Sequence, residues 1–167
     1  PTQIITVTPI APPAFVNPPT NMTIACHELA TLPPNPTLAY TNGGIATCLT
    51  SGNSTPTQSG MANVCGGMRT YTWNFTDQCS NTITHTQNIT VTPIAPPAFV
   101  NPPTSVTIAC HELATLPPAP TLSYTNGGTA TCLTTGDATP TESGMATVCG
   151  GTKTRMWNFT DQCNNSI

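Results

Sequence analysis

The feature that most constrains this chain is an internal repeat with a step of 84 residues. Four cysteines recur at this step, as the pairs Cys26/Cys110, Cys48/Cys132, Cys65/Cys149 and Cys79/Cys163. Roughly four positions in five are identical, and no insertion or deletion separates the copies. A fixed period of this length is the signature of a repeat architecture. We therefore expect two small domains of one kind, as in fibres, stalks and adhesin arms rather than in catalytic domains.

The cysteines predict disulfide bonds rather than a metal site. A domain of this size has a modest core and benefits from covalent staples. An even number of cysteines at matched spacings is typical of proteins in an oxidising compartment, which predicts a secreted, extracellular protein. No Cys-x-x-Cys pair is present, which disfavours zinc. We expect all eight cysteines to be structural disulfides, and sequence alone permits three connectivities in each unit.

Charged residues are very sparse, and this limits the partners. The chain has three Lys or Arg and six Asp or Glu, which is 5% of its residues. A basic stripe cannot form, so nucleic acid and anionic membrane surfaces are poor partners, and we expect neither nucleic-acid binding nor membrane binding. No apolar run is long enough to cross a bilayer, so we expect no membrane insertion. Solubility must come from hydroxyl and amide groups, which suits close lateral packing of copies.

Turn residues and alternating segments predict an all-β fold. Nineteen prolines and 12 glycines interrupt the chain every few positions, and the segments between them are rich in Thr, Val and Ile. This pattern is typical of a sandwich of short antiparallel strands. In the first copy we expect mostly loop over 51–60, and strands at 14–17, 22–26, 38–40, 45–50, 68–75 and 82–91.

The strand expected over 68–75 has one apolar face. Alternate residues of a strand point to the same side of the sheet, which turns Tyr71 inward together with its aromatic neighbours. In the second copy Arg155 replaces Tyr71, and we expect it at the rim, where its guanidinium reaches water. Four aromatic residues are the expected core in the two copies: Trp73, Phe75, Trp157 and Phe159.

No residue pattern predicts catalysis or a cofactor. His27-Glu28 matches half of a zinc-protease motif, but position 31, where the second histidine would stand, is Thr. No nucleophile elbow and no phosphate-binding loop is present. Asp77 and Asp161 are each the one carboxylate of their turn, so we expect them to accept backbone N–H groups rather than to bind calcium. We expect no enzyme activity, no metal and no cofactor.

Motifs along the whole repeat resemble a known module. The Pro-Pro opening, Thr23-Ile24-Ala25-Cys26, the run from Trp73 to Asn81 and the run from Thr86 to Val91 are similar to hyalin-repeat-like, immunoglobulin-type modules. Such modules occur in long repetitive surface adhesins and gliding-motility proteins of Bacteroidota. The resemblance implies immunoglobulin-like sandwiches at the bacterial surface, with a role in adhesion or surface fibres. It also implies a nested disulfide pairing: Cys26–Cys79, Cys48–Cys65, Cys110–Cys163 and Cys132–Cys149.

The phase of the repeat divides the chain into three parts. Residues 1–10 match the final strand of a unit, residues 11–94 form a complete repeat, and residues 95–167 form a repeat that lacks its own final strand. Either the segment is a window of a longer repeat protein, or residues 1–10 complete the last sandwich of a neighbouring chain by donor-strand complementation. We predict that this inter-unit strand consists of Thr2, Ile4, Ile5, Thr6, Val7 and Thr8.

The leading interpretation is a structural repeat of an extracellular filament or stalk. The Pro-rich junction over 92–97 predicts a stiff connection, so units would stack end to end as a rod. The alternative is an adhesin arm that binds a glycan or a host or surface protein through its loops. Differences between the copies are scattered rather than gathered in one loop set, which favours the structural role. The expected partners are copies of the chain along a fibre axis, with glycans or surfaces as the alternative.

Overall fold

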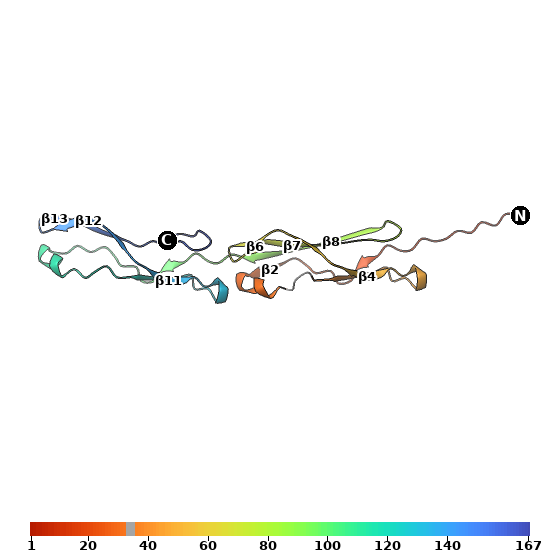
Figure 1. The fold of residues 1–167 in the computed structure, drawn as a ribbon, viewed down its shortest axis with the longest axis horizontal. Coiled ribbons are helices and arrows are strands. Elements are labelled where there is room, and N and C mark those ends of the chain that lie inside the picture. The colour runs from red at the N-terminus through yellow and green to blue at the C-terminus, as the bar shows by residue number, and fades with distance from the viewer. Residues whose placement is uncertain (33–35) are drawn as a thin grey trace. The chain divides into compact units, whose positions relative to one another are not determined.

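The computed structural model describes residues 1–32 and 36–167, and within them every extended regular element is a β-strand. The described helices are four short 3-10 segments. The chain divides into two compact units, Pro1–Thr92 and Pro93–Ile167 (Figure 1). The all-β prediction is therefore confirmed, and each unit contains one copy of the repeat.

The larger sheet of unit 1 has the strand order β2-β8-β7-β5, and β6 also pairs with β7. Its strands are β2 (Met22–Ala25), β5 (Thr57–Ser59), β6 (Ala62–Asn63), β7 (Gly66–Thr76) and β8 (Thr82–Thr92). The long strands β7 and β8 form an antiparallel hairpin and lie side by side in Figure 1. The short strand β2 pairs with β8 in parallel, from Met22 opposite Ile89 to Ala25 opposite Thr92.

The smaller sheet of unit 1 lies against the larger one. It has the order β1-β3-β4, and its strands are β1 (Ala14–Phe15), β3 (Leu38–Thr41) and β4 (Ser51–Ser54). Tyr40 of β3 stacks on Phe75 of β7 with 3.8 Å between ring centroids. The indole Nε1 of Trp73 donates a hydrogen bond to the carbonyl of Pro36 at 2.9 Å. The aromatic face of β7 therefore joins the two sheets.

The core of unit 1 follows the alternation of the strands. Tyr71 and Trp73 of β7 are each 1% exposed, and Ile89 and Val91 of β8 are buried beside them. Ile24 of β2 is buried in the same core. Since these positions share one parity on each strand, the inward face carries the apolar side chains and the outward face carries Thr and Asn.

Unit 2 repeats the smaller sheet and part of the larger one. Its elements are β9 (Ala98–Phe99), η3 (Cys110–Thr115), β10 (Leu122–Thr125), η4 (Ala130–Cys132), β11 (Thr135–Ala138), β12 (Thr141–Thr147) and β13 (Gly150–Met156). The strands form a three-stranded sheet, β11-β10-β9, and a two-stranded sheet, β12-β13. Tyr124 stacks on Phe159 at 3.8 Å, as Tyr40 does on Phe75 in unit 1.

The strand predicted over 45–50 is wrong. This segment contains the 3-10 turn η2 (Ala46–Cys48), and the strand β4 follows it, within the stretch expected to be mostly loop. The side chain of Asn42 holds the turn, because its Nδ2 donates to the carbonyl of Cys48 and its Oδ1 accepts from the amides of Gly44 and Thr50. These side-chain bonds satisfy backbone groups locally and so replace a strand ladder.

Candidate functional site at the open strand position of unit 2

The two units differ at one position of the larger sheet. In unit 1, β8 lies between β2 and β7. In unit 2, among the residues that the structure describes, β13 pairs with β12 alone, and one isolated bridge joins Thr160 to Ser166. Among the described residues, no strand pairs with the edge of β13 that corresponds to the β8 side of β7, and we call this edge the open β8 position. An edge without a partner strand presents unpaired backbone N–H and C=O groups.

The open position uncovers side chains that unit 1 buries. Trp73 is 1% exposed, whereas its counterpart Trp157 is only half-buried. Ile24 is 5% exposed, whereas its counterpart Ile108 is 37% exposed. Residues 106–109, the counterpart of β2, form no strand. Since β2 pairs with β8 alone in unit 1, this segment has no ladder to join when the β8 position is open.

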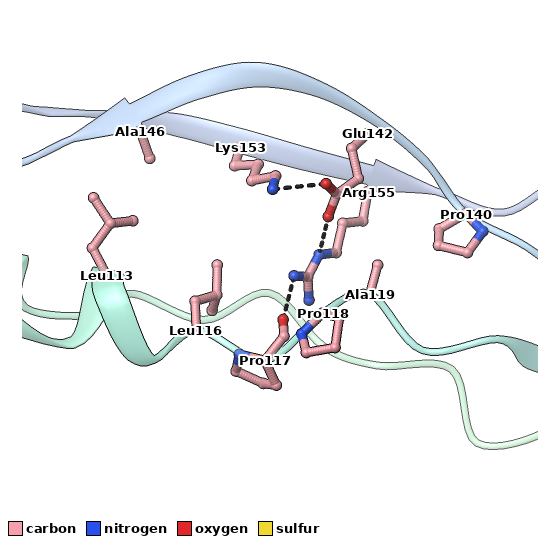
Figure 2. Close-up of a pocket in the computed structure, with 10 residues that line it drawn as sticks. All are labelled: Leu113, Leu116, Pro117, Pro118, Ala119, Pro140, Glu142, Ala146, Lys153 and Arg155. Atoms are coloured by element: carbon pink, nitrogen blue, oxygen red, sulfur yellow. Dashed lines mark hydrogen bonds and ion pairs between the residues drawn. The ribbon is translucent and has the colours of Figure 1, made fainter.

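A hollow of about 420 Å³ lies against one face of the β12–β13 hairpin, between the hairpin and the segment that contains η3 and Leu116–Ala119 (Figure 2). Lys153 Nζ lies 2.7 Å from Glu142 Oε2, and Arg155 Nε lies 2.9 Å from Glu142 Oε1. Arg155 also donates to the Pro117 carbonyl at 2.6 Å, and thus spans the hollow. The hydrogen bond from Lys153, followed by that from Arg155, holds the pKa of Glu142 below its ordinary value.

Sequence reasoning missed this charged cluster, although the repeat contained a signal for it. Arg155 stands where unit 1 has the buried Tyr71, and Glu142 stands where unit 1 has Gln58. Gln58 and Tyr71 are opposite each other in the β5–β7 ladder, and Glu142 and Arg155 are opposite each other in the β12–β13 ladder. The two substitutions therefore occur at one cross-strand pair, where opposite charges attract.

Residues 1–10 have the sequence of a buried strand but form no strand in the described chain. Ile5 is 78% exposed and Val7 is 83% exposed, whereas their counterparts Ile89 and Val91 are 3% and 2% exposed. The other residues predicted for the inter-unit strand are exposed as well: Thr2, Ile4, Thr6 and Thr8. The structure thus contains one unpaired strand sequence and one open strand position of the matching kind.

The remaining predicted core residues lie between the sheets. Phe75 and Phe159 are half-buried, and each stacks on the tyrosine of the facing strand. Trp157 Nε1 donates to the Pro120 carbonyl at 3.0 Å, in the same way as Trp73 does to Pro36 in unit 1. The aromatic contacts are thus present in both units, and exposure is what differs.

Asp77 and Asp161 organise the turns that follow the aromatic segments. Asp77 Oδ1 accepts the amides of Cys79 and Asn81, and Oδ2 accepts the side-chain amide of Asn81, each at 2.8 Å. The bond from the Asn81 side chain is the largest cause that holds the pKa of Asp77 below its ordinary value. For Asp161, burial favours the neutral form, but hydrogen bonds from Asn165 and Cys163 outweigh it and lower the pKa.

The His-Glu pair belongs to a backbone turn. In η1 (Cys26–Thr31) the Glu28 carboxylate accepts the amide of Ala25 at 2.8 Å, and Glu112 does the same for Ala109 at 2.7 Å. Among residues 1–32 and 36–167, no cluster of three or more His, Cys, Asp or Glu side chains could hold a metal ion. Within the same described ranges, no helix has the length and apolar character needed to cross a membrane.

The structure contradicts the nested disulfide pairing. The disulfide-bonded cysteines are Cys26, Cys65, Cys132 and Cys163, whereas Cys48, Cys79, Cys110 and Cys149 are free and exposed. Each predicted pair would join a bonded cysteine to a free one. The physical reason is the direction of β2, whose last residue Ala25 lies opposite Thr92, at the far end of β8 from the turn that contains Cys79.

One family model matches the chain in both units. Its description is HYR-like domain with 4 cysteines, and it matches residues 14–91 and 98–167. No curated protein and no solved structure matches the chain. The matched stretches contain all eight cysteines and nearly all strands of both units, so the whole repeat, rather than one motif, supports the match.

Proposed function

The chain belongs to the family of HYR-like domains with four cysteines, as two tandem copies, and from this premise we propose that it is a structural repeat of an extracellular surface filament or stalk. Disulfide-bonded domains of this family are typical of extracellular modules. The proposed role is mechanical rather than catalytic. Copies join end to end when residues 2–8 of one chain occupy the open β8 position in unit 2 of another chain, which is donor-strand complementation.

The observation that carries the proposal is the match between the exposed segment and the open edge. The β7–β8 register, shifted by one repeat, places Ile5 opposite Lys153 and Val7 opposite Gly151. The parallel β2–β8 register places Val106 opposite Ile5 and Ile108 opposite Val7. The donated strand therefore lies between β13 and residues 106–109, as β8 lies between β7 and β2 in unit 1.

The register of the donated strand buries the apolar side chains that are exposed in the free segment. Ile5 and Val7 take the inward positions of Ile89 and Val91, next to the hollow that Lys153 lines. Each such side chain contributes about 1.5–3 kcal/mol when it leaves water. The strand also pairs backbone groups on both of its sides. These gains oppose the cost of association and of ordering the donated segment.

The proposal is tested by one inward and one outward substitution in the same segment. Ile5→Asp places a carboxylate at a buried position and is expected to abolish end-to-end assembly. Ile4→Asp is the matched control, because its counterpart Asn88 is already polar and bonds to Thr70 on the outward face. Assembly is measured by sedimentation velocity and electron microscopy of the purified chain.

Equal assembly of the two variants would contradict donor-strand complementation. Monomers that never assemble but bind a glycan saturably would contradict the filament role and favour the adhesin arm. Adhesion, if present, would then reside in loops rather than in the strand ladder. The expected result is instead that Ile4→Asp forms filaments as the unmodified chain does, while Ile5→Asp remains monomeric.

A further inference from the structure

Each unit has two pairs of cysteines, one pair at each end of its long strand. In unit 1, Cys26 follows β2 and Cys65 precedes β7, and the η1 turn that Cys26 begins contacts β6. We call this the hairpin end. Its counterpart in unit 2 consists of Cys110, which begins η3, and Cys149, in the turn between β12 and β13.

The second pair of unit 1 lies at the opposite end, which we call the turn end. Cys79 lies in the turn between β7 and β8, and Cys48 lies in η2, between the paired strands β3 and β4. The stacking of Tyr40 on Phe75 aligns η2 with that turn. The 11 residues of β7 separate the two ends by about 35 Å. The turn end of unit 2 consists of Cys132 and Cys163.

Ends of the same kind differ in their bonding but not in their local structure. The turn end is free in unit 1 and bonded in unit 2. Yet the side-chain amide of Asn42 donates to the Cys48 carbonyl at 2.9 Å, and that of Asn126 donates to the Cys132 carbonyl at 2.8 Å. Asp77 and Asp161 accept the amides of Cys79 and Cys163, each at 2.8 Å. The local structure of a turn end therefore does not determine whether its two cysteines form disulfides.

We propose that the free turn end of unit 1, Cys48 and Cys79, forms two disulfides with the free hairpin end of unit 2, Cys110 and Cys149, in a second copy of this chain. This inference deepens the proposed function and rests on the end-to-end assembly described there. All four side chains are exposed, so a second copy can reach them.

The donated strand would bring these two ends together. In unit 1, β8 runs from the turn end at Thr82 to the hairpin end at Thr92, so a donated strand runs towards Cys110 and Cys149. Directly after it the donor chain enters its own unit 1 at the turn end, because Asn42 donates to the carbonyl of Ala11 at 3.3 Å. Only residues 9 and 10 lie between the donated strand and Ala11. The turn end of the donor chain therefore lies close to the hairpin end of unit 2 in the acceptor chain, and the two pairs of free cysteines approach each other.

The chemistry of the proposed link is an ordinary oxidation. Each new bond joins one Sγ of the turn end to one Sγ of the hairpin end and releases two protons and two electrons. A small-molecule disulfide such as oxidised glutathione accepts the electrons and leaves as two thiols. The first thiolate attacks the oxidant to form a mixed disulfide, and the thiolate of the second copy then displaces the remaining thiol.

Two double variants test the link, each of which removes the thiols of one end. Cys48→Ser/Cys79→Ser removes the turn end, and Cys110→Ser/Cys149→Ser removes the hairpin end. With oxidised glutathione, the unmodified chain is expected to form a covalent ladder that a reductant collapses. Each variant alone should stay monomeric in non-reducing electrophoresis, and an equimolar mixture should stop at the dimer. Mass spectrometry of a mixture of ¹⁴N and ¹⁵N chains should find peptides joined across isotopes.

Other results would overturn the link. Dimers of either variant alone would show that ends of the same kind bond. Peptides of one isotope only, with Cys48 joined to Cys79, would show that each end closes on itself. Electron microscopy of the same samples separates this inference from the proposed function. Filaments without cross-isotope peptides overturn the link and leave donor-strand assembly standing. The predicted peptides without filaments support the link and overturn the filament. If neither cross-isotope peptides nor filaments are found, both the link and the filament are overturned.

Discussion

Duplication places the same side chain in two different surroundings, so each unit serves as a control for the other. Trp73 and Trp157 make the same hydrogen bond to a proline carbonyl, at 2.9 and 3.0 Å, but only Trp73 is fully enclosed. The cost of losing a polar contact depends on whether water can replace it. The same substitution at each tryptophan therefore separates the effect of burial from the effect of losing the hydrogen bond.

We predict that Trp73→Phe destabilises unit 1 by about 1–3 kcal/mol, because the enclosed indole is replaced by a ring that cannot donate and the partly buried carbonyl of Pro36 loses its donor. Trp157→Phe should cost less in the unassembled chain, since water can reach its half-buried position. Hydrogen exchange of β7 and β13 amides measures both effects in the full chain. Equal losses in the two units would contradict the role assigned to enclosure.

Asp77 makes the turn after β7 sensitive to acid. Its pKa is held below the ordinary value near 3.9, so its contribution to stability is present above about pH 4 and is lost as the pH falls through the lower folded-state pKa. We predict that Asp77→Asn lowers the urea midpoint of unit 1 at pH 7, and that the difference from the unmodified chain shrinks below about pH 4. An Asn side chain has only one acceptor oxygen, so the variant cannot accept both the backbone N–H and the side-chain amide of Asn81 as the Asp77 carboxylate does. A difference that is constant from pH 7 to pH 3 would contradict this account.

At the scale of elements, β8 has two roles in unit 1, because it covers β7 and also supplies the ladder of β2. We predict that Ile89→Ala, which removes a side chain that is 3% exposed, costs about 2–5 kcal/mol and releases β2 together with β8. Thr90→Ala on the outward face is the control, and it should change stability by less than about 0.5 kcal/mol. Hydrogen exchange of residues 22–25 distinguishes the outcomes, since protection of β2 in Ile89→Ala would show that β2 holds without β8.

The sequence predicts some elements of this fold and cannot predict others. Alternation within 68–75 predicts the inward face of β7, and the lone carboxylate at Asp77 predicts its turn, because both signals are local. The direction of β2 is decided by its distant partner β8, whose paired residues are 67 positions away, and a run of four residues cannot encode it. For the same reason the disulfide pairing was wrong, since it depended on which end of the sheet β2 reaches. The turn η2 depends on one side chain, Asn42, whose bonds to Cys48 and Thr50 outweigh the β propensity of the segment.

At the scale of the molecule, the proposed assembly should appear as a change in backbone protection in unit 2. In the unassembled chain, β13 amides that face the β8 position have no ladder partner among the described residues, and residues 106–109 form no strand. A donated strand would pair with both segments, as β8 does with β7 and β2. We predict that exchange of peptides covering residues 104–109 and 150–157 slows at least tenfold on assembly, while β7 and β8 of unit 1 change little. Mass spectrometry of assembled and monomeric samples measures this directly, with Ile5→Asp as the unassembled reference. Assembly that leaves the exchange of these two segments unchanged would show that copies join through another surface.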